Sequence, residues 1–390
     1  MPHDSVPSER RARPAGDGRP VLVVGAGPAG LATAAALRAT GTRAVVLERG
    51  ARVGDSWRRH YDRLRLHTPR GISGLPGMPI PRRYGRWVGR DAMAAYLEAY
   101  ADHYDLEIVH NVEVAGIAPA VGDDPGWKVA ATGGRVLDAR RVVVATGYCH
   151  TPYVPDWPGR ESYRGELLHA AHYRNPAPYE GKDVLVVGAG NTGAEIAVDL
   201  ADGGAKRVRL AVRTLPHLVR RPLAARGAAA ARALGGPLPA RTVDRLAARV
   251  SRAAVPDLGA YGLPRPASGL YTRARAGAAP IVDDGLIAAV RERRVVPVPA
   301  VAGLDADGVL LADGERAEPE VVIAATGWRR GLEDVVGDLD VLDDRGLPRA
   351  RGWRSPEGAA GLHFVGYAAP VSGSLREIGA EARQLAKNAG

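Results

Sequence analysis

Two glycine-rich turns with the same spacing are the residues best suited to chemistry in this chain. The first runs through Gly25, Ala26, Gly27, Pro28, Ala29 and Gly30, and the second through Gly188, Ala189, Gly190, Asn191, Thr192 and Gly193. Each turn lies between an apolar run and a helical pattern, the setting in which it holds the pyrophosphate of a dinucleotide. The glycines let the phosphates approach closely, and the helix N-terminus offers them unpaired N–H groups.

The residues that end the next strand differ between the two turns. Glu48 follows the first turn, where a carboxylate can accept hydrogen bonds from ribose hydroxyls. Arg213 and Thr214 follow the second turn, and an arginine there can hold a 2′-phosphate. We therefore expect FAD at the first turn and NADPH at the second, with hydride passing from NADPH to the flavin. The competing interpretation makes Arg213 one more surface arginine in an arginine-rich chain.

The elements that position these turns repeat along the chain. Apolar or mostly apolar runs predict strands at 21–24, 44–47, 142–144, 183–187, 208–212 and 321–323, and the continuous run at 21–24 is typical of a buried parallel strand. Helical patterns are expected at 31–38, 194–201 and 375–386. This duplication predicts an α/β protein with two Rossmann-like dinucleotide-binding domains, for FAD and NADPH, the NADPH domain being inserted in the FAD domain.

The predicted boundaries follow from that insertion. Residues 19–155 and 331–390 form the FAD-binding domain, and residues 156–330 form the NADPH-binding domain with a variable segment at 216–280. Residues 1–18 are polar and basic and are expected to be a disordered tail.

Three local features complete the expected organisation. A linker rich in proline and tyrosine is expected to run to about Gly181. Asp91 is expected to be the N-cap of a helix that buries Met93, Tyr96, Leu97 and Tyr100 on one face. Within the variable segment, a helix near 242–252 carries a basic run that we interpret as a solvated face.

Composition excludes several classes of protein. The single cysteine, Cys149, permits no intrachain disulfide and no redox-active cysteine pair, which excludes a disulfide reductase. The formal net charge of +10 comes without any nucleic-acid-binding motif, so we expect no nucleic-acid partner. No apolar stretch is long enough to cross a membrane, so we expect a cytoplasmic protein. We also expect a monomer or homodimer, and no metal site.

The segment before the second turn resembles the fingerprint of the flavin-containing monooxygenases. Gly165 and His169 match it, Tyr163 replaces a phenylalanine, and Tyr173 stands where Baeyer–Villiger enzymes carry tryptophan. The resemblance extends over nearly the whole chain from Arg19 and is closest to the YUCCA-like bacterial branch. Residues 53–57 and 61–69 are similar to that branch's flavin-facing loop, and residues 372–379 to its final helix.

The resemblance implies further cofactor contacts. For FAD these are Arg49, Ser56, Trp57, Leu66, His67, Val114, Ala145, Thr146, Gly147 and Gly366. For NADPH they are Ala325, Thr326 and Gly327. His67 is the one candidate for a catalytic side chain, whereas His169 is expected to link or orient neighbouring segments.

The resemblance also implies a reaction. Reduced flavin would react with molecular oxygen to give a C4a-(hydro)peroxyflavin that oxygenates a small organic substrate, either an aryl-pyruvate or an amine or thioether. Four arginines are candidates for binding a substrate carboxylate: Arg65, Arg82, Arg83 and Arg86. Two alternatives stay open, an NADPH oxidase or flavin reductase and a basic binding protein that retains FAD structurally.

Overall fold

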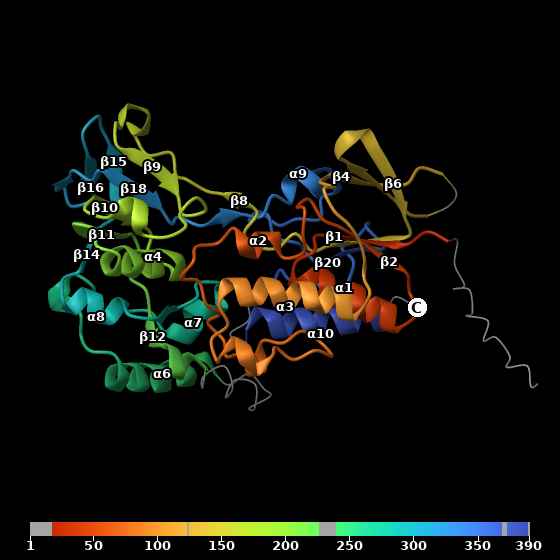
Figure 1. The fold of residues 1–390 in the computed structure, drawn as a ribbon, viewed down its shortest axis with the longest axis horizontal. Coiled ribbons are helices and arrows are strands. Elements are labelled where there is room, and N and C mark those ends of the chain that lie inside the picture. The colour runs from red at the N-terminus through yellow and green to blue at the C-terminus, as the bar shows by residue number, and fades with distance from the viewer. Residues whose placement is uncertain (1–17, 123–124, 226–238, 369–372, 389–390) are drawn as a thin grey trace, which may run out of the picture.

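The computed structural model describes residues 18–122, 125–225, 239–368 and 373–388. The predicted tail therefore lies outside the described residues except for Gly18, as do residues 226–238 of the variable segment and Ser372. Two five-stranded sheets occupy the two halves of the molecule (Figure 1). We call the halves the first and the second unit.

The first sheet is parallel, and the strand before the first glycine turn lies at its centre. Its order is β20 (Leu362–Phe364), β7 (Arg141–Val144), β1 (Val21–Val24), β2 (Ala44–Leu47) and β3 (Glu107–Val109). All four β1 residues are buried, as are three of the four in β2 and in β7. A separate antiparallel sheet of the first unit contains β4 (Val114–Pro119), β5 (Trp127–Ala131) and β6 (Arg135–Ala139).

The second sheet repeats this plan. Its order is β9 (Glu166–His169), β18 (Val321–Ala324), β10 (Asp183–Val187), β11 (Arg207–Val212) and β14 (Val295–Pro299), again all parallel. The strand before the glycine turn is again central. The predicted α/β fold with two Rossmann-like units, one inserted in the other, is confirmed.

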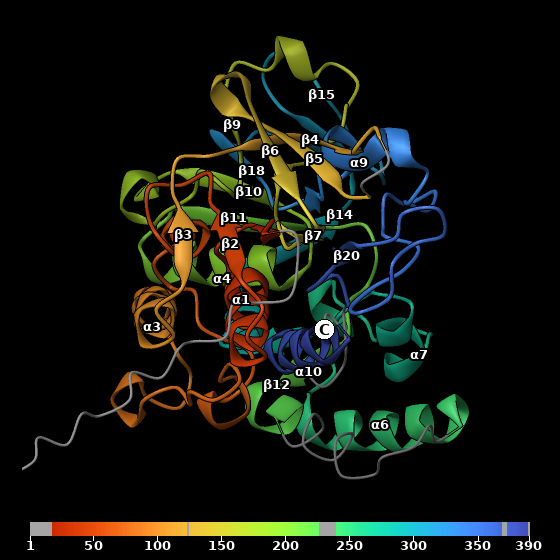
Figure 2. The ribbon, with the colours of Figure 1, turned by 90° about the vertical axis from the view of Figure 1, so that its right-hand side faces the viewer.

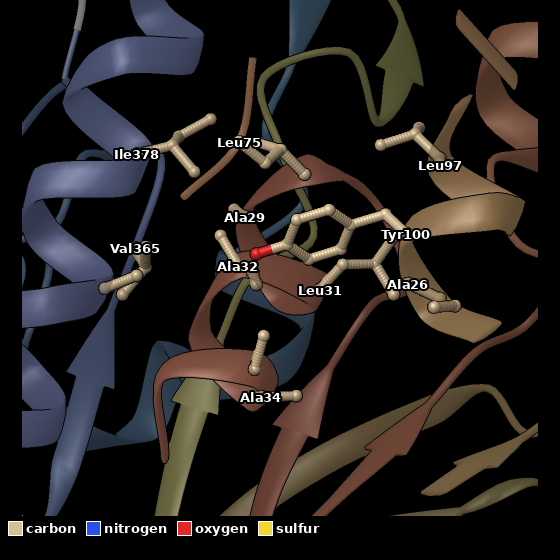
Figure 3. Close-up of a cluster of buried hydrophobic side chains, with 14 of the residues drawn as sticks. Ala26, Ala29, Leu31, Ala32, Ala34, Leu75, Leu97, Tyr100, Val365 and Ile378 are labelled. Carbon is tan, nitrogen blue, oxygen red and sulfur yellow. The ribbon is translucent and has the colours of Figure 1, made fainter. Parts of the chain in front are cut away.

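Three helices run side by side along one face of the first sheet (Figures 1 and 2). They are α1 (Pro28–Ala39), α3 (Arg90–His103) and α10 (Ser374–Lys387). Figure 3 shows where they meet: Leu31 of α1 and Ile378 of α10 lie in one apolar cluster with Tyr100 of α3. The expected buried face of α3 is confirmed, since Met93, Tyr96, Leu97 and Tyr100 are at most 1% exposed.

The second unit has fewer helices against its sheet and an additional lobe. α4 (Asn191–Asp202) follows the second glycine turn, and α8 (Leu286–Arg291) packs on α4. The variable segment contains β12 (Leu218–Arg220), α6 (Ala240–Ala254) and α7 (Leu270–Arg275), and β12 pairs with β13 (Ile281–Asp283). α6 lies at the edge of the molecule and buries none of its residues (Figure 2).

Shorter elements complete the described chain. They are α2 (Asp55–Arg58), α9 (Glu333–Val336), β15 (Val301–Leu304), β16 (Val309–Leu311), β17 (Arg316–Ala317), and single 3-10 turns at Arg70–Ile72, Arg82–Tyr84, Thr132–Gly134, Arg160–Ser162, Ala177–Tyr179, Gly259–Tyr261 and Gly337–Leu339. The chain passes between the units through two strands that pair antiparallel, β8 (Thr151–Pro152) and β19 (Trp328–Arg329). We propose domain boundaries beside this ladder, at 155/156 and 330/331.

Three local expectations need correction. Asp91 is not the N-cap of α3: Gly89 holds that position with an extended backbone, and the Asp91 carboxylate is bound by the Arg90 guanidinium. The segment before Gly181 is not all linker, because residues 166–169 form the edge strand β9 against β18. The first helix begins at Pro28, earlier than expected, since a proline suits the first helical position, where no N–H is needed.

No helix of the described ranges is both long and apolar enough to span a membrane.

Candidate functional site

A cavity of about 1910 Å³ connects the two units. It reaches from the first glycine turn, at Gly25 and Gly27, to the start of α4 at Asn191 and Thr192, and on to α6 and α7. Pockets for one small ligand usually measure roughly 300–1,000 Å³. This cavity is large enough for more than one ligand.

The residues expected to bind FAD converge on this cavity. Those that line it are Gly25, Gly27, Pro28, Ala29, Glu48, Arg49, Ser56, Trp57, Leu66, His67, Val114, Ala145, Thr146, Gly147 and Gly366. Gly30 is the exception: a Cβ on it would lie 1.8 Å from the Gly25 carbonyl oxygen. Gly30 therefore lets α1 pack tightly behind the turn.

The first turn leaves open space where a pyrophosphate would approach. Gly25 has a left-handed φ of +105°, and a Cβ there would lie 2.8 Å from the Ala145 carbonyl oxygen. A Cβ on Gly27, by contrast, would meet nothing within 4 Å. Since Gly27 is also the N-cap of α1, the unpaired N–H groups of that helix face open space.

Glu48 closes the first turn from the neighbouring strand. Its Oε2 accepts from the Ala26 N–H at 2.7 Å, and its Oε1 accepts from the Gly50 N–H at 2.7 Å. A carboxylate oxygen can accept more than one hydrogen bond. Glu48 can therefore hold the turn and still accept from a ribose hydroxyl.

The second turn has the same geometry but a different relation to the cavity. A Cβ on Gly188 would lie 2.5 Å from the Ala325 oxygen, one on Gly193 would lie 1.9 Å from the Gly188 oxygen, and Gly190 faces open space. Of the residues expected to bind NADPH, Asn191 and Thr192 line the cavity. The residues that do not are Gly188, Gly190, Gly193, Arg213, Thr214, Ala325, Thr326 and Gly327.

Two of these NADPH candidates have distinct surroundings. The Asn191 side chain donates to the Pro280 oxygen at 3.1 Å and accepts from the Val282 N–H at 2.7 Å, so it fastens β13 to α4. Arg213 is exposed just beyond β11, and it makes no ion pair with any residue that the structure describes.

His67 is held by the opposite unit. Its Nε2 lies 2.7 Å from Oε1 of Glu195 on α4, and the Tyr61 hydroxyl donates to Oε2 of the same carboxylate at 2.7 Å. Glu195 is 5% exposed, and burial together with this carboxylate raises the pKa of Tyr61. The sequence analysis missed Glu195, although an acid that falls among the apolar residues of a predicted helix was a usable signal.

The fingerprint residues hold segments of the second unit together and do not line the cavity. The Tyr163 ring covers Gly165, where a Cβ would lie 2.3 Å from the Tyr163 hydroxyl oxygen. The Tyr173 hydroxyl donates to Asp199 on α4 at 2.8 Å. His169 Nδ1 accepts from the Ala171 N–H at 3.0 Å, so Nε2 donates to the Gly327 oxygen, and burial lowers the pKa of His169.

The variable segment supplies an apolar wall that the sequence did not reveal. Val243, Leu246, Ala247 and Val250 of α6 line the cavity, and α7 adds Leu270, Tyr271 and Ala274. Asp244 fixes α7 to α6 by accepting from the backbone N–H of Tyr271 at 2.6 Å. The arginines of α6 (Arg241, Arg245, Arg249 and Arg252) lie on its opposite side by helical periodicity and do not line the cavity, which agrees with a solvated basic face.

Cationic side chains also reach the cavity. Arg65 lines it, whereas Arg82, Arg83 and Arg86 do not. The sequence analysis missed Arg220, which lines the cavity from β12 and makes no ion pair with any described residue. Within the described part of the chain, no three His, Cys, Asp or Glu side chains gather as metal ligands would.

Comparison with known proteins shows the family of this chain. Residues 22–221 match the family described as pyridine nucleotide-disulphide oxidoreductase. Indole-3-pyruvate monooxygenase YUCCA1 of Oryza sativa subsp. japonica is 36% identical over 351 residues, 89% of this chain and 86% of the rice protein. The chain belongs to the flavin-containing monooxygenases. The family description names a disulphide, but this chain has one cysteine and so no disulfide of its own.

Two further comparisons agree with the flavin-containing monooxygenase family. The probable indole-3-pyruvate monooxygenase YUCCA3 of Arabidopsis thaliana is 33% identical over 365 residues, 89% of this chain and 81% of that protein. The structure of a flavin-containing monooxygenase from Stenotrophomonas maltophilia superposes with a TM-score of 0.71 and 26% identity, covering 95% of this chain and 97% of that one. The chain described here is therefore an enzyme of the flavin-dependent monooxygenase class.

A more distant structure supports the fold alone. Cyclohexanone monooxygenase, at 18% identity, superposes with a TM-score of 0.70 over 95% of this chain and 87% of that one.

Proposed function

We propose that the chain is an NADPH-dependent FAD monooxygenase whose substrate is an aryl-pyruvate of the indole-3-pyruvate type. The observation that carries the proposal is the continuous cavity from the glycine turn beside Glu48, past His67, to the start of α4 and the apolar wall of α6. One enclosure can thus receive a flavin, a nicotinamide and a small substrate together.

The first turn fits FAD. Open space at Gly27, a helix N-terminus behind it and the Glu48 carboxylate match a pyrophosphate and a ribose that carries no 2′-phosphate. Ser56, Trp57, Leu66 and His67 from the 55–67 region, with Gly366, would enclose the rest of the cofactor. Bound FAD would supply the reaction with oxygen, which no amino-acid side chain performs.

The second turn fits NADPH. Gly190 faces open space at the N-terminus of α4, as Gly27 does at α1. The exposed Arg213 guanidinium can form charge-assisted hydrogen bonds with a 2′-phosphate, and no carboxylate of the described residues neutralises it. NADPH bound here would place its hydride source toward the cavity that Asn191 and Thr192 line.

The far end of the cavity supports this substrate class. Leu246 and Val250 are 62% and 45% exposed although they line it, so an apolar surface is offered to whatever enters. Arg220 adds a cation on β12, which contacts α6, and Arg65 lines the same cavity. An aromatic ring joined to a carboxylate satisfies both features, and the similarity to indole-3-pyruvate monooxygenases favours the keto acid over an amine or thioether.

The protein's own contribution is to bind and enclose. The apolar residues of α6 and α7 would exclude water from the reacting centre, and an arginine would fix the substrate by its carboxylate. The balanced reaction is aryl-pyruvate, oxygen, NADPH and a proton giving arylacetate, carbon dioxide, NADP⁺ and water.

The first test is reduction of the bound flavin. The purified protein should be yellow, and its visible band should fade when NADPH is added without oxygen. A protein that stays colourless after reconstitution with FAD would overturn the proposal. Under ¹⁸O₂, indole-3-pyruvate should give indole-3-acetate that carries one labelled oxygen. Stoichiometric peroxide with every keto acid, amine and thioether would instead show an oxidase or flavin reductase.

The second test concerns the arginine anchor. Arg220→Ala should raise KM for the keto acid about tenfold or more, since a hydrogen bond to a charged group contributes about 1.5–3 kcal/mol. Arg82→Ala is the matched control because Arg82 is an exposed arginine that does not line the cavity. Equal KM values for the two variants would remove Arg220 from the substrate site.

A further inference from the structure

A buried carboxylate joins the two units at the wall of the cavity. Glu195 is 5% exposed, and both its oxygens are occupied, Oε1 by His67 Nε2 and Oε2 by the Tyr61 hydroxyl, each at 2.7 Å. His67 and Tyr61 come from the loop of the first unit, whereas Glu195 lies on α4, directly after the second glycine turn. The contact therefore exists only between the units.

The position of Glu195 is not explained by the fold itself. When the two glycine turns are aligned residue by residue, Gly30 matches Gly193 and Ala32 of α1 matches Glu195 of α4. Ala32 is fully buried in an apolar cluster, so this place in a helix after a glycine turn accepts a small apolar residue. A buried acid costs free energy unless it is hydrogen-bonded, and here two donors satisfy it.

The two donors also determine how the imidazole is protonated. Burial raises the pKa of Tyr61, so its hydroxyl keeps its proton and donates to Glu195. His67 can bind the remaining oxygen only with a proton on Nε2, because a carboxylate is an acceptor. In the neutral ring this leaves Nδ1 as an acceptor. Nδ1 has no hydrogen-bond partner in the described part of the chain, and the side chain is 31% exposed.

We propose that Glu195 is a positioning residue for the reaction: it fixes His67 in the Nε2–H tautomer and offers Nδ1 as an acceptor to a hydrogen-bond donor of a ligand in the cavity. The inference rests on the proposed function in one respect, namely that ligands of the reaction occupy the cavity that His67 lines. Two further ion pairs hold the loop against α4: Arg63 lies 2.8 Å from Asp202 and 3.7 Å from Asp199.

The substitution Glu195→Met separates positioning from packing. Methionine has nearly the same length, but its thioether is at most a weak acceptor. His67 Nε2–H and the Tyr61 hydroxyl both lose the carboxylate, so nothing at position 195 fixes the tautomer of His67. Glutamine is unsuitable, because its oxygen could still accept from His67 while its NH₂ group donates to the Tyr61 hydroxyl oxygen.

Nitrogen NMR of the ¹⁵N-histidine-labelled full chain measures the tautomer without any turnover. The spectra are recorded about two pH units above the ordinary histidine pKa, and His67→Gln identifies the His67 signals. We expect the pure Nε2–H pattern in the wild type and the averaged pattern of a tautomer mixture in Glu195→Met. A wild-type protein with the Nδ1–H tautomer would overturn the proposal, even where the methionine variant does not fold. An unchanged pattern in the folded variant would do the same.

Kinetics with the FAD-loaded enzyme give the second measurement. Glu195→Met should lower kcat about tenfold while FAD content and KM for NADPH stay within twofold, which is the result expected when a general acid–base or orienting group is misplaced. Asp199→Asn is the matched control, because it alters the same face of α4 one turn later without touching His67. It should leave the His67 tautomer unchanged.

The possible failures are distinguishable. An altered tautomer without any fall in kcat would overturn the positioning role and leave the proposed function standing. A protein that never binds FAD would overturn the proposed function, whereas the NMR result would still report on Glu195 and His67.

Discussion

In the first unit a carboxylate closes the glycine turn, and among the described residues of the second unit no carboxylate does so. The turns themselves are nearly superimposable in conformation, with φ of +105° at Gly25 and +116° at Gly188. Each first glycine lies against the alanine that directly follows a neighbouring strand, Ala145 after β7 in one unit and Ala325 after β18 in the other. The strand register aligns Leu47 with Ala211, so Glu48 corresponds to Val212 and Arg49 to Arg213.

This comparison teaches which residues carry specificity. Glu48 binds the backbone of the turn, whereas the valine at its place in the second unit cannot, and the next residue there is the exposed Arg213. We therefore propose that the glycines form a common cradle for a dinucleotide phosphate and that the strand end decides the rest of the ligand. The second unit also puts Asn191 in place of Pro28, and the Asn191 side chain holds β13.

The largest effect should come from filling the last glycine of each turn. Gly30→Ala and Gly193→Ala would bring a Cβ to 1.8 Å and 1.9 Å from the carbonyl oxygen of the first glycine in the same turn. Overpacking of this kind usually costs about 1–3 kcal/mol, and here it also displaces the phosphate-binding backbone. We expect Gly30→Ala to abolish FAD binding. Gly193→Ala should keep the yellow colour and lose reduction by NADPH.

Flavin absorbance and anaerobic reduction measure these two losses separately. Gly181→Ala is a useful control, since a Cβ there meets nothing within 4 Å although its φ of +74° adds local strain. If Gly193→Ala lost FAD as completely as Gly30→Ala while remaining folded, the two units would not be separate sites.

A smaller effect is expected from exchanging the chemistry at the strand ends. Arg213→Ala should raise KM for NADPH about 10- to 100-fold and leave KM for NADH unchanged, since a charge-assisted hydrogen bond contributes about 1.5–3 kcal/mol. Steady-state kinetics with both nucleotides measures the ratio. Arg164→Ala, another exposed arginine of the second unit, is the control.

The matching change in the first unit is Glu48→Gln. Glutamine has one acceptor oxygen and so cannot bind both the Ala26 and Gly50 N–H groups. FAD should dissociate about tenfold more readily, with no change in the preference for NADPH. An NADPH preference that followed Glu48 and not Arg213 would reverse the assignment of the two sites.

Local sequence patterns sufficed for the duplicated core of the fold. The strands at β1, β2, β7, β10, β11 and β18 were predictable because each is a short, mostly apolar run, and β1, β7, β10 and β18 directly precede a glycine turn or an Ala-Thr-Gly element. The cavity wall beside the first turn was predictable to the extent that motif and resemblance name it, from Gly25 to Gly366.

The remaining parts depend on contacts between distant residues. β9 becomes a strand through pairing with β18, and its residues 166–169 include a glutamate and a histidine, so no apolar run marks them. The Tyr61–Glu195 contact spans 134 positions in the chain. The apolar residues of α6 are recognisable as a helix face, but nothing in the sequence tells that this face turns toward a cavity.

The edge strands of the two sheets offer the finest comparison. β20 pairs with β7 in the first sheet as β9 pairs with β18 in the second. When the two pairs are aligned, His363 is equivalent to Leu168 and Phe364 to His169. His363 is 8% exposed, and burial, with the Arg141 charge nearby, lowers the pKa of His363 to about 4. The second sheet has an apolar side chain at that position, so a histidine is not required there for the fold.

The smallest effect should be the pH dependence that His363 adds to the stability of the first unit. Below the ordinary histidine pKa of about 6.5, the unfolded chain takes up a proton that the folded chain refuses until about pH 4. The free energy of unfolding must therefore fall as the pH is lowered through this window, by at most about 1.4 kcal/mol per unit from one group. His363→Leu, which copies Leu168, should remove about 1 kcal/mol of the decrease between pH 6 and pH 5 in urea unfolding, measured against the exposed His103→Leu as control. Equal decreases in the wild type and in His363→Leu would mean that His363 is protonated in the folded enzyme, and that the two edge strands differ less than their residues indicate.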